Sequence, residues 1–197
     1  MVLERVLSAV FLINLFASTI RIATPILLPA LGEIFAEKSG VLNIGLEAQI
    51  LTGALSGFIA AYYLNNNWLG FIIGTLGGVL ISLLFAFLTI NLNADQIVVG
   101  ITLNIFALGL TTFFYRVFFH VSTVPPSVEP MKEVQIPVLS ELPVIGPILF
   151  QQKPIVYLAL LFVPIASYVL YRTLWGLNLR SVGEYPLASE TMGINVK

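Results

Sequence analysis

The sequence predicts an all-α protein built as a polytopic bundle of transmembrane helices. Charged residues make up only 10% of the 197-residue chain, whereas about 25% is usual in a soluble domain. Hydrophobic residues make up 58% and the mean hydropathy is +0.97. Apolar runs of about 20 residues, the length that crosses a bilayer core, recur along the chain. No strand-like alternation competes over such lengths.

The first membrane helix is expected at about residues 6–32. We interpret it as a retained helix, because its apolar run exceeds the length of a cleavable signal. Arg21 lies midway along it, where a charge costs about 2.5–3.5 kcal/mol on insertion scales. Pro25 has no N–H for the carbonyl of Arg21, so this helix is predicted to be kinked or broken. Arg21 either caps the freed carbonyls or pairs with an acid such as Glu47, or it lines a translocation path.

The second and third helices are expected at about 41–64 and 68–92. The first turns of the second helix carry three polar side chains, which is unusual for an apolar run: Asn43, Glu47 and Gln49. They form either a structural network or part of a translocation path. Glycines four residues apart form one stripe on each helix and let two backbones approach closely. These glycines are Gly53, Gly57, Gly70, Gly74 and Gly78. We expect them to serve helix packing, and pore lining is the alternative.

The fourth and fifth helices are expected at about 96–119 and 154–175. Asn104 lies about 13 Å along the fourth helix from Asp95. Its amide is expected to hydrogen-bond a neighbouring helix, or alternatively to meet a substrate. The connection over 120–153 contains six prolines and is predicted to be an extended, mostly non-helical surface loop.

The tail, residues 176–197, becomes polar after the last apolar run. Pro186 opens a short helix-compatible stretch, PLASETM, and Gly193 closes it. Proline early and glycine just after is the usual asymmetry of a helix. Such a short helix is marginal alone, so it is either an amphipathic surface turn or a docking element for a soluble partner.

Several chemistries have no support in the sequence. The chain has no cysteine and one histidine, His120, which excludes thiolate catalysis and histidine-rich metal sites. No nucleotide-binding GxxxxGK[ST] motif is present. The net charge of −1 gives no basic face for nucleic acid. We therefore predict no catalytic residues, no metal and no cofactor.

Three stretches together resemble a known family. They are TPILLPALGEIFAEKSGVLNIGLEAQILTGA (24–54), DQIVVGITLNIFALGLTTFFYR (95–116) and GLNLRSVGEYPLASETMGINV (176–196). They are similar to the permease subunits of bacterial ABC importers, in the branched-chain amino acid/simple-sugar permease family and its nucleoside and simple-sugar branch. Ala48 stands where that branch usually has glycine.

The resemblance implies an orientation in the bacterial cytoplasmic membrane. Lys and Arg divide equally between the two sides, so charge alone gives none. By resemblance the tail over 176–197 is a cytoplasmic coupling loop and the 120–153 loop is external. Asn43 and Glu47 would then tie loop backbone to neighbouring helices at the cytoplasmic side. The implied ATPase-coupling residues are Arg180, Glu184, Pro186, Leu187, Ala188, Ser189, Glu190 and Gly193.

The function implied is that of a permease without chemistry of its own. Its expected partners are an ABC ATPase subunit, a second permease subunit (itself or a paralogue), an extracytoplasmic solute-binding protein or lipoprotein, and membrane lipid. A purine nucleoside is the expected solute, with a pentose or other simple sugar next. The alternatives are an ion-coupled carrier that uses Arg21 and Glu47, and a membrane scaffold without transport. Because family permeases continue with further helices, this chain is expected to be C-terminally truncated.

Overall fold

The computed structural model describes residues 9–120, 125–137 and 139–196, and in these ranges it confirms the all-α prediction. The chain divides into two compact units, one of Met1–Gly32 and Met131–Leu177 and the other of Glu33–Pro130 and Asn178–Lys197. Helix α2 (Ala9–Lys38) and helix α8 (Leu174–Glu184) each contribute residues to both units.

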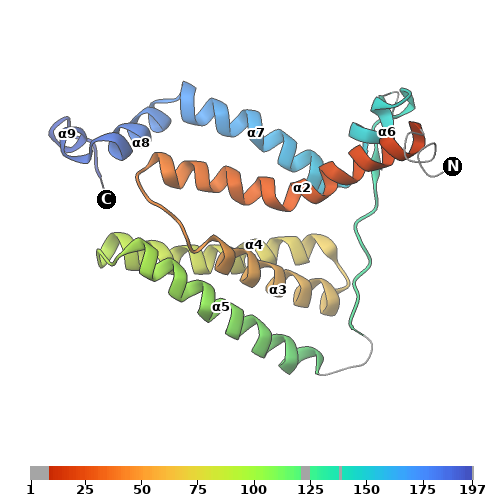
Figure 1. Cartoon of the computed structure of the whole chain (residues 1–197), viewed down its shortest axis with the longest axis horizontal. Coiled ribbons are helices and arrows are strands. Elements are labelled where there is room, and N and C mark those ends of the chain that lie inside the picture. Colours follow the sequence, from red (N-terminus) through yellow and green to blue (C-terminus); the bar gives the residue numbers. More distant parts are fainter. Residues whose placement is uncertain (1–8, 121–124, 138, 197) are drawn as a thin grey trace. The chain divides into compact units, whose positions relative to one another are not determined.

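Helix α2 remains unbroken through Pro25 and Pro29, so the alternative of a broken helix is wrong. Figure 1 shows its ribbon changing direction part-way along instead. The helix also runs to Lys38, beyond the expected end at residue 32, because Glu33–Lys38 are mostly good helix formers and Lys38 lies favourably in the last turn. The expected start at residue 6 lies outside the described residues.

The connection between α5 and α7 is more structured than a plain loop. It contains β1 (Val134–Gln135), the 3₁₀ helix η2 (Leu139–Glu141), α6 (Ile145–Leu149) and β2 (Gln151–Gln152). The two strands pair antiparallel, Val134 with Gln152 and Gln135 with Gln151. Helix α7 (Pro154–Arg172) follows and also belongs to the first unit.

The second unit is built on three helices that lie side by side in Figure 1. They are α3 (Leu46–Leu64), α4 (Asn67–Ala86) and α5 (Gln96–Phe119), and α4 continues as a π-helix, η1 (Phe87–Asn91). Side chains cap two of the N-termini. Asn66 accepts from the N–H groups of Trp68 and Leu69, and Asp95 from those of Ile97 and Val98. Small and apolar side chains form the core between the helices, namely Ala48, Phe85, Val99, Leu103 and Ala107.

Helices α3 and α4 approach backbone to backbone. A Cβ at Gly74 would lie 2.8 Å from the carbonyl oxygen of Gly53 and 3.2 Å from the Cα of Gly57. A Cβ at Gly70 would lie 2.9 Å from the carbonyl oxygen of Gly57. A Cβ at Gly78 would lie 3.4 Å from the carbonyl oxygen of Gln49. The glycine stripes therefore meet at this helix pair, where larger residues would force the helices apart.

Four helical stretches in the described part of the chain are long and apolar enough to cross a membrane: Val10–Lys38, Asn67–Asn91, Gln96–Phe119 and Pro154–Arg172. Only 6% of the most apolar window in Asn67–Asn91 is buried, so its surface suits a lipid or protein environment better than water. Helix α3, the second expected span, is not among the four. It carries Glu47, Gln49 and Thr52 in its first two turns. Its 19 residues still give a length of about 28 Å.

Candidate functional site

The first polar cluster surrounds Arg21 in the middle of α2. Its Nη1 lies 2.8 Å from the carboxylate of Glu133. Its Nε donates to the Oε1 of Gln152 at 2.8 Å, and its Nη2 donates to the carbonyl of Gln151 at 3.2 Å. All three guanidinium nitrogens are therefore used, and the acid that pairs with Arg21 is Glu133, not Glu47. The predicted pairing of Arg21 with an acid is therefore made, but the connection before α7 supplies that acid and Glu47 does not.

Gln152 is the centre of this cluster and is fully buried. Besides accepting from Arg21, its Nε2 donates to the carbonyl of Ile148 at 2.7 Å, and its backbone N–H donates to the hydroxyl of Tyr157. Buried amides need such partners, since an unpaired one is costly. The cluster fixes β2 and α6 to α2, which is what a structural role for Arg21 requires.

The second polar cluster holds the turn between α2 and α3, residues 39–45. Asn104 of α5 donates from Nδ2 to the carbonyl of Ile44 at 3.0 Å, and its Oδ1 accepts from the N–H of Ala48 at 2.9 Å. Gln96 of α5 accepts from the N–H of Leu42 at 2.7 Å. Asn43 and Gln49 exchange side-chain bonds of 3.3 and 3.4 Å. Two amides of α5 thus bind the backbone where α3 begins.

Glu33 and Glu47 lie near this turn and differ in their surroundings. Glu33 of α2 accepts from the N–H of Asn43 at 3.1 Å through Oε1, whereas its Oε2 is buried and has no hydrogen-bond partner in the described part of the chain. Glu47 is exposed in the first turn of α3, a favourable position for a negative charge. The structure therefore brings Asn43, Gln49 and Asn104 to one region, while Arg21 belongs to the other unit.

The tail forms two helices where the sequence predicted one. Helix α8 precedes the expected short helix, which is α9 (Pro186–Thr191) with Pro186 in its first turn. Gly193 has a φ of +80°. The N–H of Gly193 donates to the carbonyl of Glu190, and that of Ile194 donates to the carbonyl of Ser189. This is a Schellman motif, which explains why glycine follows the helix.

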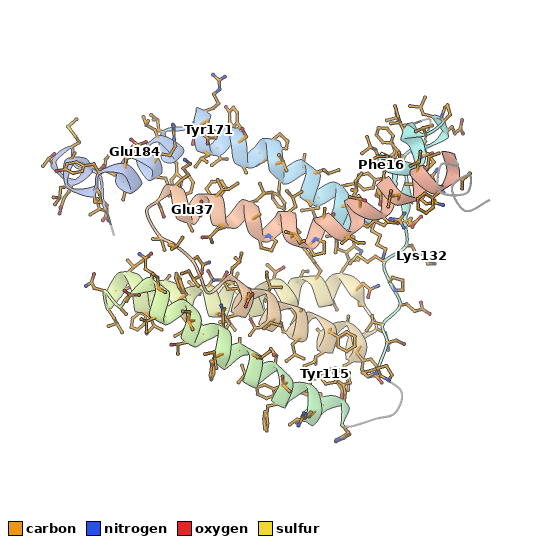
Figure 2. All side chains as sticks on the ribbon, viewed as in Figure 1. Phe16, Glu37, Tyr115, Lys132, Tyr171 and Glu184 are labelled. Atoms are coloured by element: carbon orange, nitrogen blue, oxygen red, sulfur yellow. The ribbon has the colours of Figure 1, made fainter. Side chains whose placement is uncertain are left out.

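The surface of the tail combines apolar and acidic side chains. Tyr185, Leu187 and Met192 are 61%, 66% and 81% exposed, and Glu184 and Glu190 are exposed as well. Figure 2 labels Glu184 at the end of α8. Ser189 is buried and donates to the carbonyl of Tyr185. Arg180 lies on α8.

An aromatic group lies at the far end of α3 and α5. Tyr62, Tyr63 and Phe119 have ring centroids 5.1–6.2 Å apart, and Tyr115 packs on Phe119 at 5.3 Å. Figure 2 shows Tyr115 near the C-terminal end of α5. Aromatic side chains are enriched at membrane–water interfaces. The two ends of α3 therefore differ, with polar contacts to the turn at one end and stacked rings at the other.

Several residues of these clusters were not singled out from sequence. Glu133, Gln151 and Gln152 lie in the proline-rich connection, where nothing marks a polar partner for Arg21. Glu33 could have been singled out from the sequence, because it is an acid that directly follows an apolar run. In the described part of the chain, no group of three or more His, Asp or Glu side chains is arranged to hold a metal ion.

Comparison with known proteins identifies the family. The family described as "Branched-chain amino acid transport system / permease component" matches residues 15–197. The chain is 37% identical over 188 residues to the guanosine ABC transporter permease protein of Bacillus subtilis, covering 91% of this chain and 58% of that protein. It is 39% identical over 181 residues to the nucleoside ABC transporter permease protein of Lactococcus lactis, covering 88% and 57%.

A protein of Haloferax volcanii, provisionally named a glucose ABC transporter permease, is 38% identical over 190 residues, covering 94% of this chain and 56% of that protein. The chain thus spans a little over half the length of these curated relatives. No solved structure matches it. Because the family match covers nearly the whole sequence, the chain belongs to the branched-chain amino acid transport system permease family, whose members are multi-pass proteins of the cytoplasmic membrane.

Proposed function

We propose that the chain is part of the membrane-spanning permease of an ATP-driven importer, and that a partner ATPase hydrolyses the nucleotide. The observation that carries the proposal is α9, a short capped helix with Leu187 exposed on it and Met192 exposed directly after it, in a chain of this family. Isolated six-residue helices are unstable in water, so a helix stabilised by its own cap and exposing apolar side chains fits a docking role. We propose that the ATPase subunit is the partner that binds α9.

We propose that the tail is cytoplasmic and that the 120–153 connection is external. Helix α3 supports placing the tail and the start of the 120–153 connection on opposite sides of the membrane, because its first turn adjoins the turn that contacts α8 and the rings of its last turn pack on Phe119. Which of the two sides is cytoplasmic follows from the resemblance to the family. Its length of about 28 Å is close to the roughly 30 Å of a hydrocarbon core. On this proposal α3 is the fifth span.

A nucleoside is the proposed solute, a purine nucleoside first, with a simple sugar as the runner-up. The names of the relatives support this order, since two refer to guanosine or nucleosides and one to glucose. A solute-binding protein would deliver the solute, and a second permease subunit would complete the path. Calorimetry with the partner binding protein tests the order: heat on adding guanosine supports it, and heat only on adding ribose or glucose contradicts it.

Charge reversal tests the ATPase surface. Glu184→Lys with Glu190→Lys is expected to reduce co-purification of the ATPase subunit, because the two carboxylates lie on either side of the exposed Leu187 in the sequence. Glu141→Lys, an exposed acid in η2, is the matched control and is expected to leave co-purification unchanged. Equal recovery of the ATPase with both variants would contradict the docking role. Uptake that survives ATP depletion and collapses with an uncoupler would favour an ion-coupled carrier instead.

A further inference from the structure

The turn between α2 and α3, residues 39–45, approaches α8 backbone to backbone. A Cβ at Gly183 would lie 2.9 Å from the carbonyl carbon of Lys38 and 3.0 Å from the nitrogen of Gly40. A Cβ at Gly40 would lie 3.3 Å from the Cα of Gly183. The carbonyl oxygen of Lys38 would lie even closer to the Cβ at Gly183. No side chain larger than hydrogen fits between these segments, so α8 and the turn have little room to move independently.

Gly40 is also the C′ residue of α2, two positions after its last residue, Lys38. Its φ is +87°; its N–H donates to the carbonyl of Glu37, and the N–H of Val41 donates to the carbonyl of Ala36. These bonds form a Schellman motif. The same glycine therefore closes the helix and carries the contact with Gly183, so that a displacement at this contact acts directly on the end of α2.

Residues 42–45 of the turn are held by α5 and by Glu33. The N–H groups of Leu42 and Asn43 donate to Gln96 and Glu33, and the carbonyl of Ile44 accepts from Asn104. A Cβ at Gly100 of α5 would lie 2.9 Å from the nitrogen of Gly45. These polar backbone groups are thus satisfied by side chains of other elements, which fixes the turn to α5 as well as to α8.

We propose that this turn is the joint through which displacement of the α8–α9 segment reaches α5 and α3. The inference rests on the proposed function, in which α9 binds the ATPase. Close-packed contacts transmit a shift because they cannot be compressed, and small shifts at packed interfaces are converted into larger helix movements. Gly40 and Gly183 transmit the movement at one contact, and Gln96 and Asn104 receive it at the other; all four are positioning residues.

The first test uses the assembled importer in proteoliposomes and measures solute transported per ATP hydrolysed. Gly183→Ala is expected to lower this ratio about fivefold or more, the lower range of site-to-site coupling, because the added methyl separates α8 from the turn. The ATPase is expected to co-purify as before, since the exposed face of α9 is unchanged. Gly109→Ala is the control, because nothing lies within 4 Å of a Cβ at that position of α5.

The second test acts at the other contact and does not depend on how Gly183→Ala assembles. Gln96→Met removes the acceptor for the N–H of Leu42 at similar size, and Gln96→Glu keeps it. The ratio is expected to fall with methionine and to be retained with glutamate. The proposal that this turn is the joint would be overturned if transport and ATP hydrolysis fell in parallel in these variants. An equal ratio of solute transported to ATP hydrolysed in both Gln96 variants would overturn it as well. Failure of the wild-type chain to bind an ATPase would instead overturn the proposed function.

Discussion

The Nη1 of Arg21 lies 2.8 Å from the carboxylate of Glu133, which joins the middle of α2 to the connection that precedes α7. The Nε of the same guanidinium binds Gln152, a fully buried amide. An intramembrane charge is costly without partners. Here the planar guanidinium satisfies three acceptors at once, a geometry that lysine cannot reproduce.

Arg21→Met is therefore expected to destabilise the protein by about 1–3 kcal/mol, the cost of leaving a buried polar partner unsatisfied. Gln152 then loses the donor to its Oε1. Thermal unfolding in detergent, followed by size-exclusion, measures the shift. Lys132→Met is the control, because Lys132 is an exposed cation next to Glu133. Equal midpoints for the two variants would contradict a structural role for Arg21.

Gly74→Ala is expected to destabilise the α3–α4 pair by about 1–3 kcal/mol, the usual cost of overpacking. The methyl would approach the backbone of Gly53 and Gly57, which cannot swing away as a side chain can. Gly109→Ala has open space and gains helix propensity, up to about 1 kcal/mol. The same thermal assay compares the two. A stabilised Gly74→Ala variant would show that the glycines are not needed for close packing.

Hydropathy and residue spacing predict the long helices well because those signals are local. Asp95 illustrates this, since an N-cap residue directly precedes the apolar run of α5. The contacts of Arg21 could not be predicted, because Gln152 is 131 positions away. Strands of two residues, such as β1 and β2, are too short to show the alternation that marks a strand.

Helix α8 shows a second limit of sequence reasoning. Its residues include Gly176, Asn178 and Gly183, which have poor helix propensity, so the segment looked like a polar tail. The two glycines are required by packing, since a Cβ at either would meet the carbonyls of α7 or the turn after α2. Tertiary contacts therefore outweigh local propensity here, and the contact between Gly40 and Gly183 follows from those same packing demands.

Asp95→Ala is expected to cost about 1 kcal/mol, the typical loss of an N-cap. The side chain accepts from the N–H groups of Ile97 and Val98 at 2.9 and 3.0 Å, and alanine leaves both donors without this acceptor. Asp95→Asn keeps an acceptor oxygen and is expected to stay within a few tenths of wild type. Chemical or thermal denaturation of the purified protein distinguishes them. Equal losses for alanine and asparagine would point to the charge of Asp95 as the important property.

Gly193→Ala tests whether the ordered C-terminal cap of α9 matters for partner binding. A Cβ there meets nothing within 4 Å, so the cost arises only from the left-handed backbone, about 1–2 kcal/mol for most residues. Asparagine tolerates that conformation better and is the matched control. Alanine is expected to loosen the Schellman bonds of Gly193 and Ile194 and to reduce co-purification of the ATPase, while Gly193→Asn retains most of it. Because neither variant alters the exposed side chains of α9, a loss confined to alanine would assign the effect to the backbone cap, whereas equal recovery would show that the proposed docking surface forms without it.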